Sequence, residues 1–250
     1  MIKLTTVSKY YSQSSSVGPL TLDIPKAGLT SLIGPNGAGK STMLLMIGRL
    51  LKLDAGTIHV AGMNVADTRS GDLARVLAIL RQDNHFITRL TVRQLVAFGR
   101  FPYSGGRLTV VDYQAIARYI EFFNLESIAD CYLDELSGGQ RQRAYVAMIL
   151  CQETDYILLD EPLNNLDIAH SVQMMDHLRQ AVDSLGRTIV MVLHDLNFAA
   201  RYSDYICAMQ AGQIQHFGPP ASIFRPEILS ELYGTPVEVY ESPRGLVVAV

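Results

Sequence analysis

The stretch Gly34-Pro35-Asn36-Gly37-Ala38-Gly39-Lys40-Ser41 decides the fold of this 250-residue chain. It fills every fixed position of the phosphate-binding pattern G-x-x-x-x-G-K-[ST]. The glycines let the backbone curl so that its N–H groups converge on phosphate oxygens, and the helix that follows adds the positive end of its dipole. The stretch therefore predicts a loop that binds the phosphates of a nucleotide.

The segments on both sides of this loop support that prediction. Residues 29–33 predict a short buried strand, and residues 41–53 have the apolar spacing of a helix. The alternative is a chance glycine turn, which the preceding strand and the following helix disfavour. Lys40 is expected to reach the β- and γ-phosphates of ATP, and the Ser41 hydroxyl to hold Mg²⁺. The residues predicted to bind the nucleotide in this loop are Gly34, Pro35, Asn36, Gly37, Ala38, Gly39, Lys40, Ser41 and Thr42.

Two acidic residues, Asp160 and Glu161, follow the apolar run at residues 156–159. A carboxylate at the end of such a strand can bind Mg²⁺, directly or through water, and we predict this role for Asp160. Its neighbour Glu161 can accept a proton from the attacking water. The alternative is a solvated strand end before a turn at Pro162, and the phosphate loop earlier in the chain makes that alternative weaker.

A third motif, Leu136-Ser137-Gly138-Gly139-Gln140, lies between the other two. Ser137 and Gln140 can cap a helix without any ligand. Two adjacent glycines in the first turn of a helix, however, cost roughly 1 kcal/mol each relative to alanine. That cost is understandable if backbone N–H groups must approach an anion closely. The motif is therefore a second phosphate site, and one ATP cannot bind deep in both loops if they lie apart in the fold.

The order of these three motifs resembles that of the ATP-binding cassette (ABC) ATPases, and the resemblance extends along essentially the whole chain. In that family two cassettes meet head to tail, and each ATP lies between the phosphate loop of one chain and the LSGGQ motif of the other. The resemblance implies a homodimer that hydrolyses ATP cooperatively. The residues implied to touch the γ-phosphate in trans are Ser137, Gly138, Gly139 and Gln140.

Further positions match the family pattern. Gln82 is similar to the glutamine that senses Mg²⁺, water and the membrane partner, and Asp167 to the aspartate of the D-loop. His194 is similar to the histidine that contacts the γ-phosphate and positions both Glu161 and water. The resemblance thus implies catalytic roles for Glu161, His194 and Gln82, and metal ligation by Ser41, Gln82 and Asp160.

Each of these assignments has a plainer alternative. Gln82 can be a solvated loop residue, and His194 can cap the helix that begins near Asp195 or be a satisfied core histidine. Tyr11 has the spacing from the phosphate loop expected of the aromatic residue that stacks on adenine, but its neighbour Tyr10 can take the same role. The ordered occurrence of all the motifs favours the functional interpretation.

The alternation of predicted strands and helices indicates an α/β fold with a mainly parallel sheet and nucleotide at the strand carboxyl ends. The resemblance specifies a P-loop NTPase (RecA-like) core, an N-terminal antiparallel β part and an inserted α-helical subdomain. We predict one nucleotide-binding domain over residues 1–250. Its core covers about 1–86 and 155–217, its helical subdomain about 87–154, and its C-terminal tail about 218–250.

Composition narrows the class of protein. Apolar residues make up 48% and charged residues 18%, as in globular proteins. The net charge of -3 shows no basic excess, so we expect no nucleic-acid partner. The N-terminus has no hydrophobic signal region, and the longest uncharged run, residues 205–224, is interrupted by glycine and proline. Any association with a membrane is therefore expected to occur through a partner.

A single cassette of this kind fits the ATPase subunit of a bacterial importer. The resemblance implies a peripheral position at the cytoplasmic face of the inner membrane, permease subunits as partners and, indirectly, a substrate-binding protein. Residues 90–103, LTVRQLVAFGRFPY, are similar to importers of siderophores, haem and cobalamin. Residues 161–167 and 193–199 are similar to the ferric-siderophore branch. Haem, cobalamin or another nutrient stays open as cargo, as does a soluble ABC ATPase without a permease.

Overall fold

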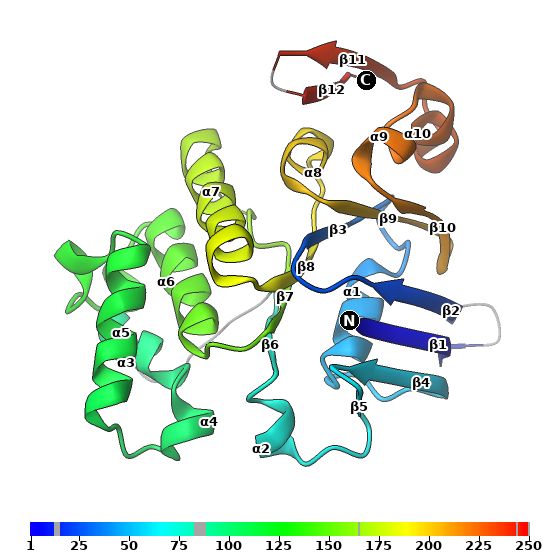
Figure 1. Cartoon of the computed structure of the whole chain (residues 1–250). Coiled ribbons are helices and arrows are strands. Elements are labelled where there is room, and N and C mark those ends of the chain that lie inside the picture. The colour runs from blue at the N-terminus through cyan, green and yellow to red at the C-terminus, as the bar shows by residue number, and fades with distance from the viewer. Residues whose placement is uncertain (13–15, 83–88, 165, 244, 250) are drawn as a thin grey trace.

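The computed structural model describes residues 1–12, 16–82, 89–164, 166–243 and 245–249 (Figure 1). The helices are α1 (Lys40–Ile47), α2 (Ser70–Leu73), α3 (Val92–Phe98), α4 (Phe101–Ser104), α5 (Val110–Phe122), α6 (Gly138–Cys151), α7 (Ile168–Leu185), α8 (Leu196–Tyr202), α9 (Pro220–Ile223) and α10 (Pro226–Tyr233), with short 3₁₀ turns η1 (Glu126–Ile128) and η2 (Leu133–Glu135). The strands are β1 (Ile2–Tyr10), β2 (Ser16–Ile24), β3 (Leu29–Ile33), β4 (Ala55–Val60), β5 (Met63–Asn64), β6 (Leu77–Leu80), β7 (Tyr156–Asp160), β8 (Thr188–Val192), β9 (Tyr205–Gln210), β10 (Gln213–Gly218), β11 (Glu238–Ser242) and β12 (Gly245–Ala249).

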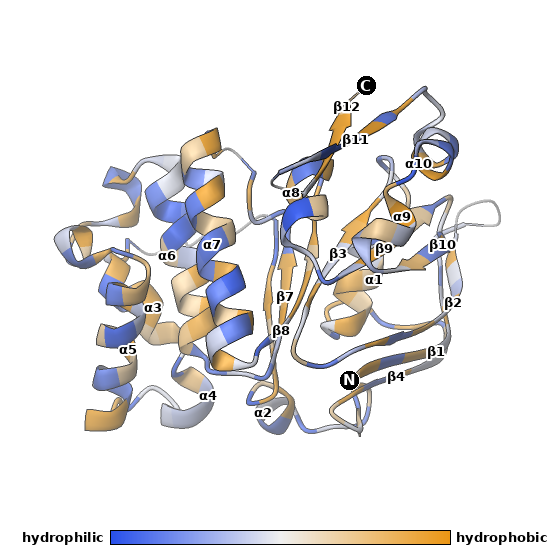
Figure 2. Ribbon diagram, turned by 45° about the horizontal axis from the view of Figure 1, so that its top comes forward, coloured by the Kyte–Doolittle hydropathy of each residue, from blue (hydrophilic) through white to orange (hydrophobic). Residues whose placement is uncertain are grey.

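A six-stranded sheet in the order β10-β9-β3-β8-β7-β6 forms the centre of the protein. All neighbouring pairs are parallel except β9 and β10, which form an antiparallel hairpin. Strands β3, β7 and β8 are buried along their whole length, and Figure 2 shows β7 and β8 as strongly hydrophobic. Their side chains alternate between two hydrophobic cores: Ile157 and Leu159 enter one, and Leu158 enters the other. A parallel sheet covered on both faces needs such continuous apolar strands.

Helix α1 packs in the core between the central sheet and a second, antiparallel sheet of order β2-β1-β4-β5. The prediction that this helix extends over residues 41–53 is wrong at its C-terminal end, because α1 stops at Ile47. Gly48 follows it and Arg49 has a φ of +56°, a left-handed conformation that a continuing helix does not allow. Leu50, which is 53% exposed, extends the apolar pattern without being in the helix.

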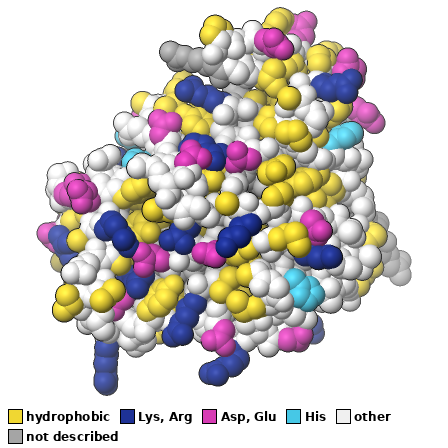
Figure 3. All heavy atoms as spheres, in the orientation of Figure 1, with side chains coloured by type: hydrophobic (Ala, Val, Ile, Leu, Met, Phe, Trp, Pro, Cys, Tyr) yellow, Lys and Arg dark blue, Asp and Glu magenta, His cyan; other side chains and the backbone are white. Residues whose placement is uncertain are grey.

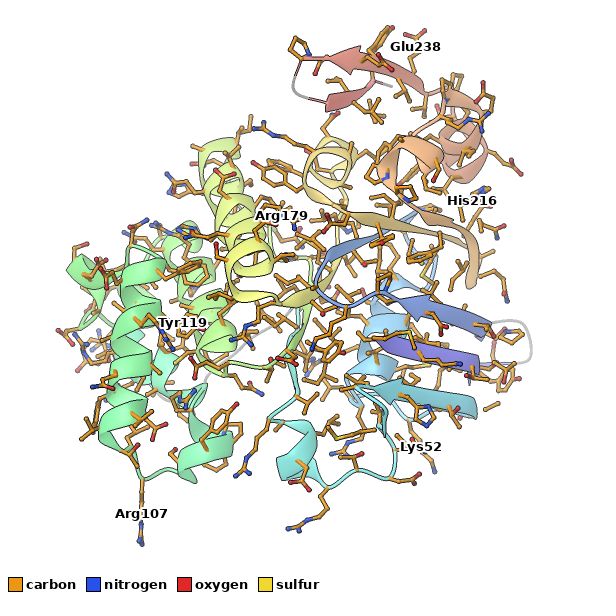
Figure 4. The ribbon with its side chains drawn as sticks, viewed as in Figure 1. Lys52, Arg107, Tyr119, Arg179, His216 and Glu238 are labelled. Carbon is orange, nitrogen blue, oxygen red and sulfur yellow. The ribbon has the colours of Figure 1, made fainter. Side chains whose placement is uncertain are left out.

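Helices α3 to α6 pack together on the side of the central sheet away from β1, β2 and β4 (Figure 1). The cap expected from Ser137 and Gln140 is present as a capping box, and Thr91 and Gln94 form a second one at the start of α3. In Figure 4, Tyr119 of α5 lies among these helices while Arg107 points away from the protein. Tyr119 is 3% exposed and belongs to the core of this group.

Arg100, in the segment between α3 and α4, is a buried cation that ties the helical group together. Its guanidinium donates to Asp112 Oδ1 at 2.9 Å, to the Cys151 carbonyl at 3.0 Å and to Glu153 Oε2 at 2.8 Å. Pro102 lies in the first turn of α4, where a proline is tolerated because the backbone N–H it lacks would have no partner in the helix. The similarity of this segment to importer ATPases thus coincides with a buried ion-pair network.

The predicted boundary at residues 86/87 lies outside the described residues. The division into core, helical subdomain and tail stays a prediction. After β10, the chain forms α9, α10 and the β11–β12 hairpin, which occupy the top of Figure 1. Among the residues that the structure describes, the helices lack the combination of length and apolarity that a membrane crossing requires.

Candidate nucleotide-binding site

The phosphate loop leads from β3 into α1, and its backbone requires glycine at two points. Gly34 has a φ of +140°, and a Cβ at this position would lie 2.0 Å from the carbonyl oxygen of Met209. Gly39 has a φ of +96°, and its Cβ would lie 2.9 Å from Val17. Because Gly39 also caps α1, the N–H groups of the first helical turn have no capping side chain over them. These groups are oriented to bind an anion.

Lys40 lies folded over this loop. Its Nζ donates to the carbonyl oxygens of Gly34 at 2.7 Å and Pro35 at 3.0 Å. The side chain is buried, which lowers the pKa of Lys40, and the nearby carboxylates of Glu161 and Asp160 partly offset that shift. The ammonium group therefore lies where it can exchange carbonyl partners for phosphate oxygens.

Ser41 and Asp160 meet at the end of β7, where the Ser41 hydroxyl donates to Asp160 Oδ1 at 2.9 Å. Burial raises the pKa of Asp160, and the hydrogen bond from Ser41 acts in the opposite direction. A hydroxyl and a carboxylate oxygen are the kind of hard donors that Mg²⁺ prefers. Two of the three predicted metal ligands are thus in contact, whereas the third, Gln82, contacts Glu161.

The three predicted catalytic residues are in contact, because the Glu161 carboxylate touches both Gln82 and His194. Gln82 Nε2 donates to Glu161 Oε2 at 2.8 Å, and His194 Nε2 lies 2.7 Å from Glu161 Oε1. Glu161 has a φ of +53°, a conformation that is uncommon for a residue with a side chain and that clusters at functional sites. The turn after β7 therefore aims this carboxylate at Gln82 and His194.

Both plainer alternatives for His194 are wrong. The cap of α8 is Asp195, whose side chain accepts from the backbone N–H groups of Asn197 and Phe198. The side chain of His194 is 45% exposed, so it is not a core histidine. Gln82 is exposed, as the loop alternative requires, but its amide is engaged by Glu161.

Asn164 is a neighbour of this cluster that the sequence reasoning missed. Its Nδ2 donates to Glu161 Oε2, and its backbone N–H donates to the Glu161 carbonyl at 3.2 Å in the turn after β7. The signal that points to it is an amide side chain three residues after the acidic residue, across a tight turn.

Tyr11 lies beside the phosphate loop, and its hydroxyl is 3.0 Å from the Thr42 hydroxyl. Tyr11 helps to line a cavity of about 240 Å³ together with residues of the phosphate loop, Glu161 and His194. Tyr10, the alternative adenine partner, is outside the described lining of this cavity, and both tyrosines are exposed. The geometry favours Tyr11 as the residue next to a bound nucleotide.

The LSGGQ residues are outside the described lining of that cavity. Ser137 Oγ accepts from the Gln140 N–H at 3.2 Å, and Gln140 Oε1 accepts from the Ser137 N–H at 3.0 Å. A Cβ on Gly139 would lie 3.2 Å from the His170 ring, so packing against α7 also explains this glycine. Ser137 and Gly138 are exposed and can meet another molecule.

Asp167 acts as the cap of α7 within this chain. Its carboxylate accepts from the His170 N–H at 2.8 Å and lies 2.8 Å from His170 Nδ1. These contacts, the backbone hydrogen bond first, lower the pKa of Asp167. Asn165, two residues before Asp167, lies outside the described residues. Contact between Asp167 and a nucleotide stays a prediction.

The family model described as ABC transporter matches residues 17–164. The chain belongs to the ABC transporter family. It is an ATPase of this family, and the predicted α/β fold class is confirmed. This ABC ATPase is 62% identical to the petrobactin import ATP-binding protein FatE of Bacillus anthracis, over 98% of each chain. It is 47% identical to the petrobactin import ATP-binding protein YclP of Bacillus subtilis (strain 168), again over 98% of each chain.

Solved structures of the family have the same fold. The ATP-binding cassette MJ0796, in a dimeric post-hydrolysis state bound to ADP and Pi, has a TM-score of 0.78 and is 28% identical. The match covers 88% of this ABC ATPase and 99% of that chain. The motifs that predict a nucleotide-binding cassette therefore lie in the fold of a known one.

Proposed function

We propose that this chain is the ATP-hydrolysing subunit of a bacterial importer of ferric siderophores. The observation that carries the proposal is the position of the Glu161 carboxylate, held by Gln82 and His194 at the cavity that the phosphate loop lines. The high identity to two petrobactin import ATP-binding proteins supports a ferric siderophore, such as ferric petrobactin, as the cargo.

The residues of the cavity suggest how each part acts on ATP. The N–H groups of the loop and Lys40 bind the phosphates, and the ring of Tyr11 stacks on the adenine. Ser41, Asp160 and Gln82 would hold Mg²⁺. Bound Mg²⁺ draws negative charge away from the phosphate oxygens.

Glu161 is the proposed general base, which accepts a proton from the water that attacks the γ-phosphorus. In the structure both of its carboxylate oxygens are engaged, Oε1 by His194 and Oε2 by Gln82 and Asn164. An ionised carboxylate has about four acceptor sites, so these three contacts leave Glu161 able to accept a proton from water while its side chain is held in place.

We further propose that a second copy of the chain completes the site. The LSGGQ segment begins α6 with exposed Ser137 and Gly138, and Ile168 next to Asp167 is 80% exposed. A cassette of the same fold is a dimer in its post-hydrolysis state. In the proposed dimer, Ser137 to Gln140 bind the γ-phosphate of the ATP held by the partner.

An apolar groove on the helical group suits a partner in the membrane. It has a volume of about 310 Å³ and runs along α3, α4 and the segment before α5. Phe98 and Phe101, which line it, are 49% and 60% exposed. Figure 3 shows apolar side chains reaching the surface over this group at the lower left. An amphipathic helix of a permease can dock in such a groove. Docking there would place the chain at the cytoplasmic surface of the membrane. A substrate-binding protein would act on the opposite side of the membrane.

A charge in this groove tests the permease contact. We expect Phe98→Asp to abolish co-purification of the chain with its permease from detergent-solubilised membranes, because the carboxylate would be buried against apolar partner surface. ATP binding should be unchanged. The control is Val247→Asp, which places the same charge at a 40% exposed valine of β12. Equal recovery of permease with both variants would contradict the assignment of the groove.

The cargo is tested in the cell. A strain that lacks this chain should lose uptake of radiolabelled iron bound to petrobactin, and the wild-type gene should restore it while Glu161→Gln should not. Uptake of haem and cobalamin should be unaffected. Loss of haem or cobalamin uptake instead would assign another nutrient, and a chain that recovers no permease at all would indicate a soluble ABC ATPase.

A further inference from the structure

The C-terminal helix α10 reaches the first residue of the phosphate loop. The backbone N–H of Gly34 donates to the hydroxyl oxygen of Tyr233, the last residue of α10, at 3.0 Å. The two residues are 199 positions apart in the sequence. Tyr233 is half-buried and its ring packs against the main core. A segment outside the nucleotide motifs therefore contacts the loop directly.

This contact gives the Gly34 N–H a hydrogen-bond partner that the sheet does not supply. The parallel pairing of β3 with β9 has Ile33 opposite Ala208 as its last pair. Gly34 is buried at the point where the chain leaves the sheet, and the carbonyl of Met209 approaches it closely. A buried N–H without a partner is costly, so the Tyr233 hydroxyl satisfies a group that would otherwise destabilise this position of the loop.

The end of α10 is itself fixed to the same part of the sheet. Gln210, the last residue of β9, donates from Nε2 to the carbonyls of Glu231 at 3.3 Å and Leu232 at 3.1 Å. Gly234 then ends the helix with a φ of +66°. The Tyr233 hydroxyl is thereby held against Gly34, and burial raises the pKa of Tyr233 to about 12, so it stays protonated.

Gly34 is also linked to the group that binds phosphate. Its carbonyl accepts from Lys40 Nζ at 2.7 Å. A shift of the Gly34 backbone would displace both this carbonyl and the N–H groups that follow it in the loop. We propose that Tyr233 is a positioning residue for nucleotide binding: its hydroxyl fixes the start of the phosphate loop in the conformation that accepts phosphates. This inference rests on the proposed nucleotide site.

The test is Tyr233→Phe in the full chain, which keeps the ring and its packing and removes only the hydroxyl. Without the hydroxyl, the Gly34 N–H loses its hydrogen-bond partner. The fraction of molecules whose phosphate loop has the conformation that binds phosphates then falls. We expect the Kd for ADP, measured calorimetrically with Mg²⁺ present, to rise about tenfold. The ATP Kd should rise by the same factor, because both nucleotides bind the loop. The Gly34 amide should also exchange its hydrogen faster.

Tyr202→Phe is the matched control. It removes a hydroxyl that donates to Asp176 Oδ1 at 2.9 Å, in a contact between α8 and α7. Both variants should lower the melting temperature by a similar amount, but Tyr202→Phe should leave the ADP Kd unchanged. Gln210→Ala, which loosens the end of α10, should weaken ADP binding severalfold and decides the matter if Tyr233→Phe does not fold.

An unchanged ADP Kd in Tyr233→Phe, or in Gln210→Ala if the first variant does not fold, overturns the inference. Equal weakening in Tyr202→Phe also overturns it, because the effect would then reflect general stability. A wild-type chain that binds neither ADP nor ATP would instead contradict the proposed function, so the two failures are distinguishable.

Discussion

Glu161→Gln is expected to bind ATP as tightly as the wild-type chain while hydrolysing it about 100- to 1,000-fold more slowly. Glutamine has the same shape, and its side-chain oxygen can still accept a hydrogen bond from Gln82 or His194. It cannot accept a proton from water at neutral pH. Because the phosphate loop is untouched, the binding step should be preserved and the ATP-bound dimer should accumulate.

A single-turnover assay with radiolabelled ATP measures this effect without interference from product release. The matched control is Glu227→Gln, which makes the same change at an exposed residue of α10. It should hydrolyse ATP at the wild-type rate. If Glu161→Gln turns over its bound ATP at nearly the wild-type rate, Glu161 is not the general base, and its contacts with Gln82 and His194 would then have a structural purpose.

Local chemistry explains why much of the fold could be predicted from sequence. Strands β7 and β8 are short and almost entirely apolar, and such runs are recognisable as buried strands. Ser137 and Thr91 carry their capping partners three residues later, so both helix starts were predictable. The end of α1 was not predictable, because the apolar spacing continues past Gly48. The helix stops before Arg49, whose backbone is left-handed.

The candidate site shows where such reasoning stops. Gln82 and His194 were assigned from family resemblance, which already implied that His194 positions Glu161, whereas the hydrogen bond from Gln82 to the same carboxylate comes from the structure. Tyr233 could not be found at all, because its partner Gly34 is distant in sequence and a backbone N–H leaves no trace in the residue pattern. Long-range contacts to the backbone depend on tertiary packing, which motif spacing does not encode.

The glycines of the LSGGQ motif have more than one physical explanation. In the sequence, the two glycines suggest close approach to an anion. Packing of Gly139 against the His170 ring provides a second reason for one of them. Gly138 is exposed and remains the glycine that a ligand explains best. The trans role of the motif must therefore be tested at an exposed position whose substitution leaves the packing of α6 on α7 intact.

Ser137→Arg meets that requirement, and we expect it to abolish ATP-driven dimerisation. Ser137 is exposed, so an arginine fits on the surface of the single chain but would occupy the space that the partner's γ-phosphate and loop need. Loss of the N-cap should cost only about 1 kcal/mol of stability. Binding of ATP to the monomer should be retained, because the motif is outside the described lining of the phosphate cavity.

Sedimentation velocity in a Glu161→Gln background separates these effects, because ATP is then bound without being hydrolysed. The background alone should sediment as a dimer with ATP and as a monomer without it. Adding Ser137→Arg should leave a monomer at ATP concentrations that saturate the loop. Ser137→Asn retains a capping side chain of small size and should preserve at least part of the dimer. A bulky cation at Ser137 could not be accommodated beside the phosphate loop of a partner. If the arginine variant still forms an ATP-dependent dimer of undiminished stability, the nucleotide is not shared between chains.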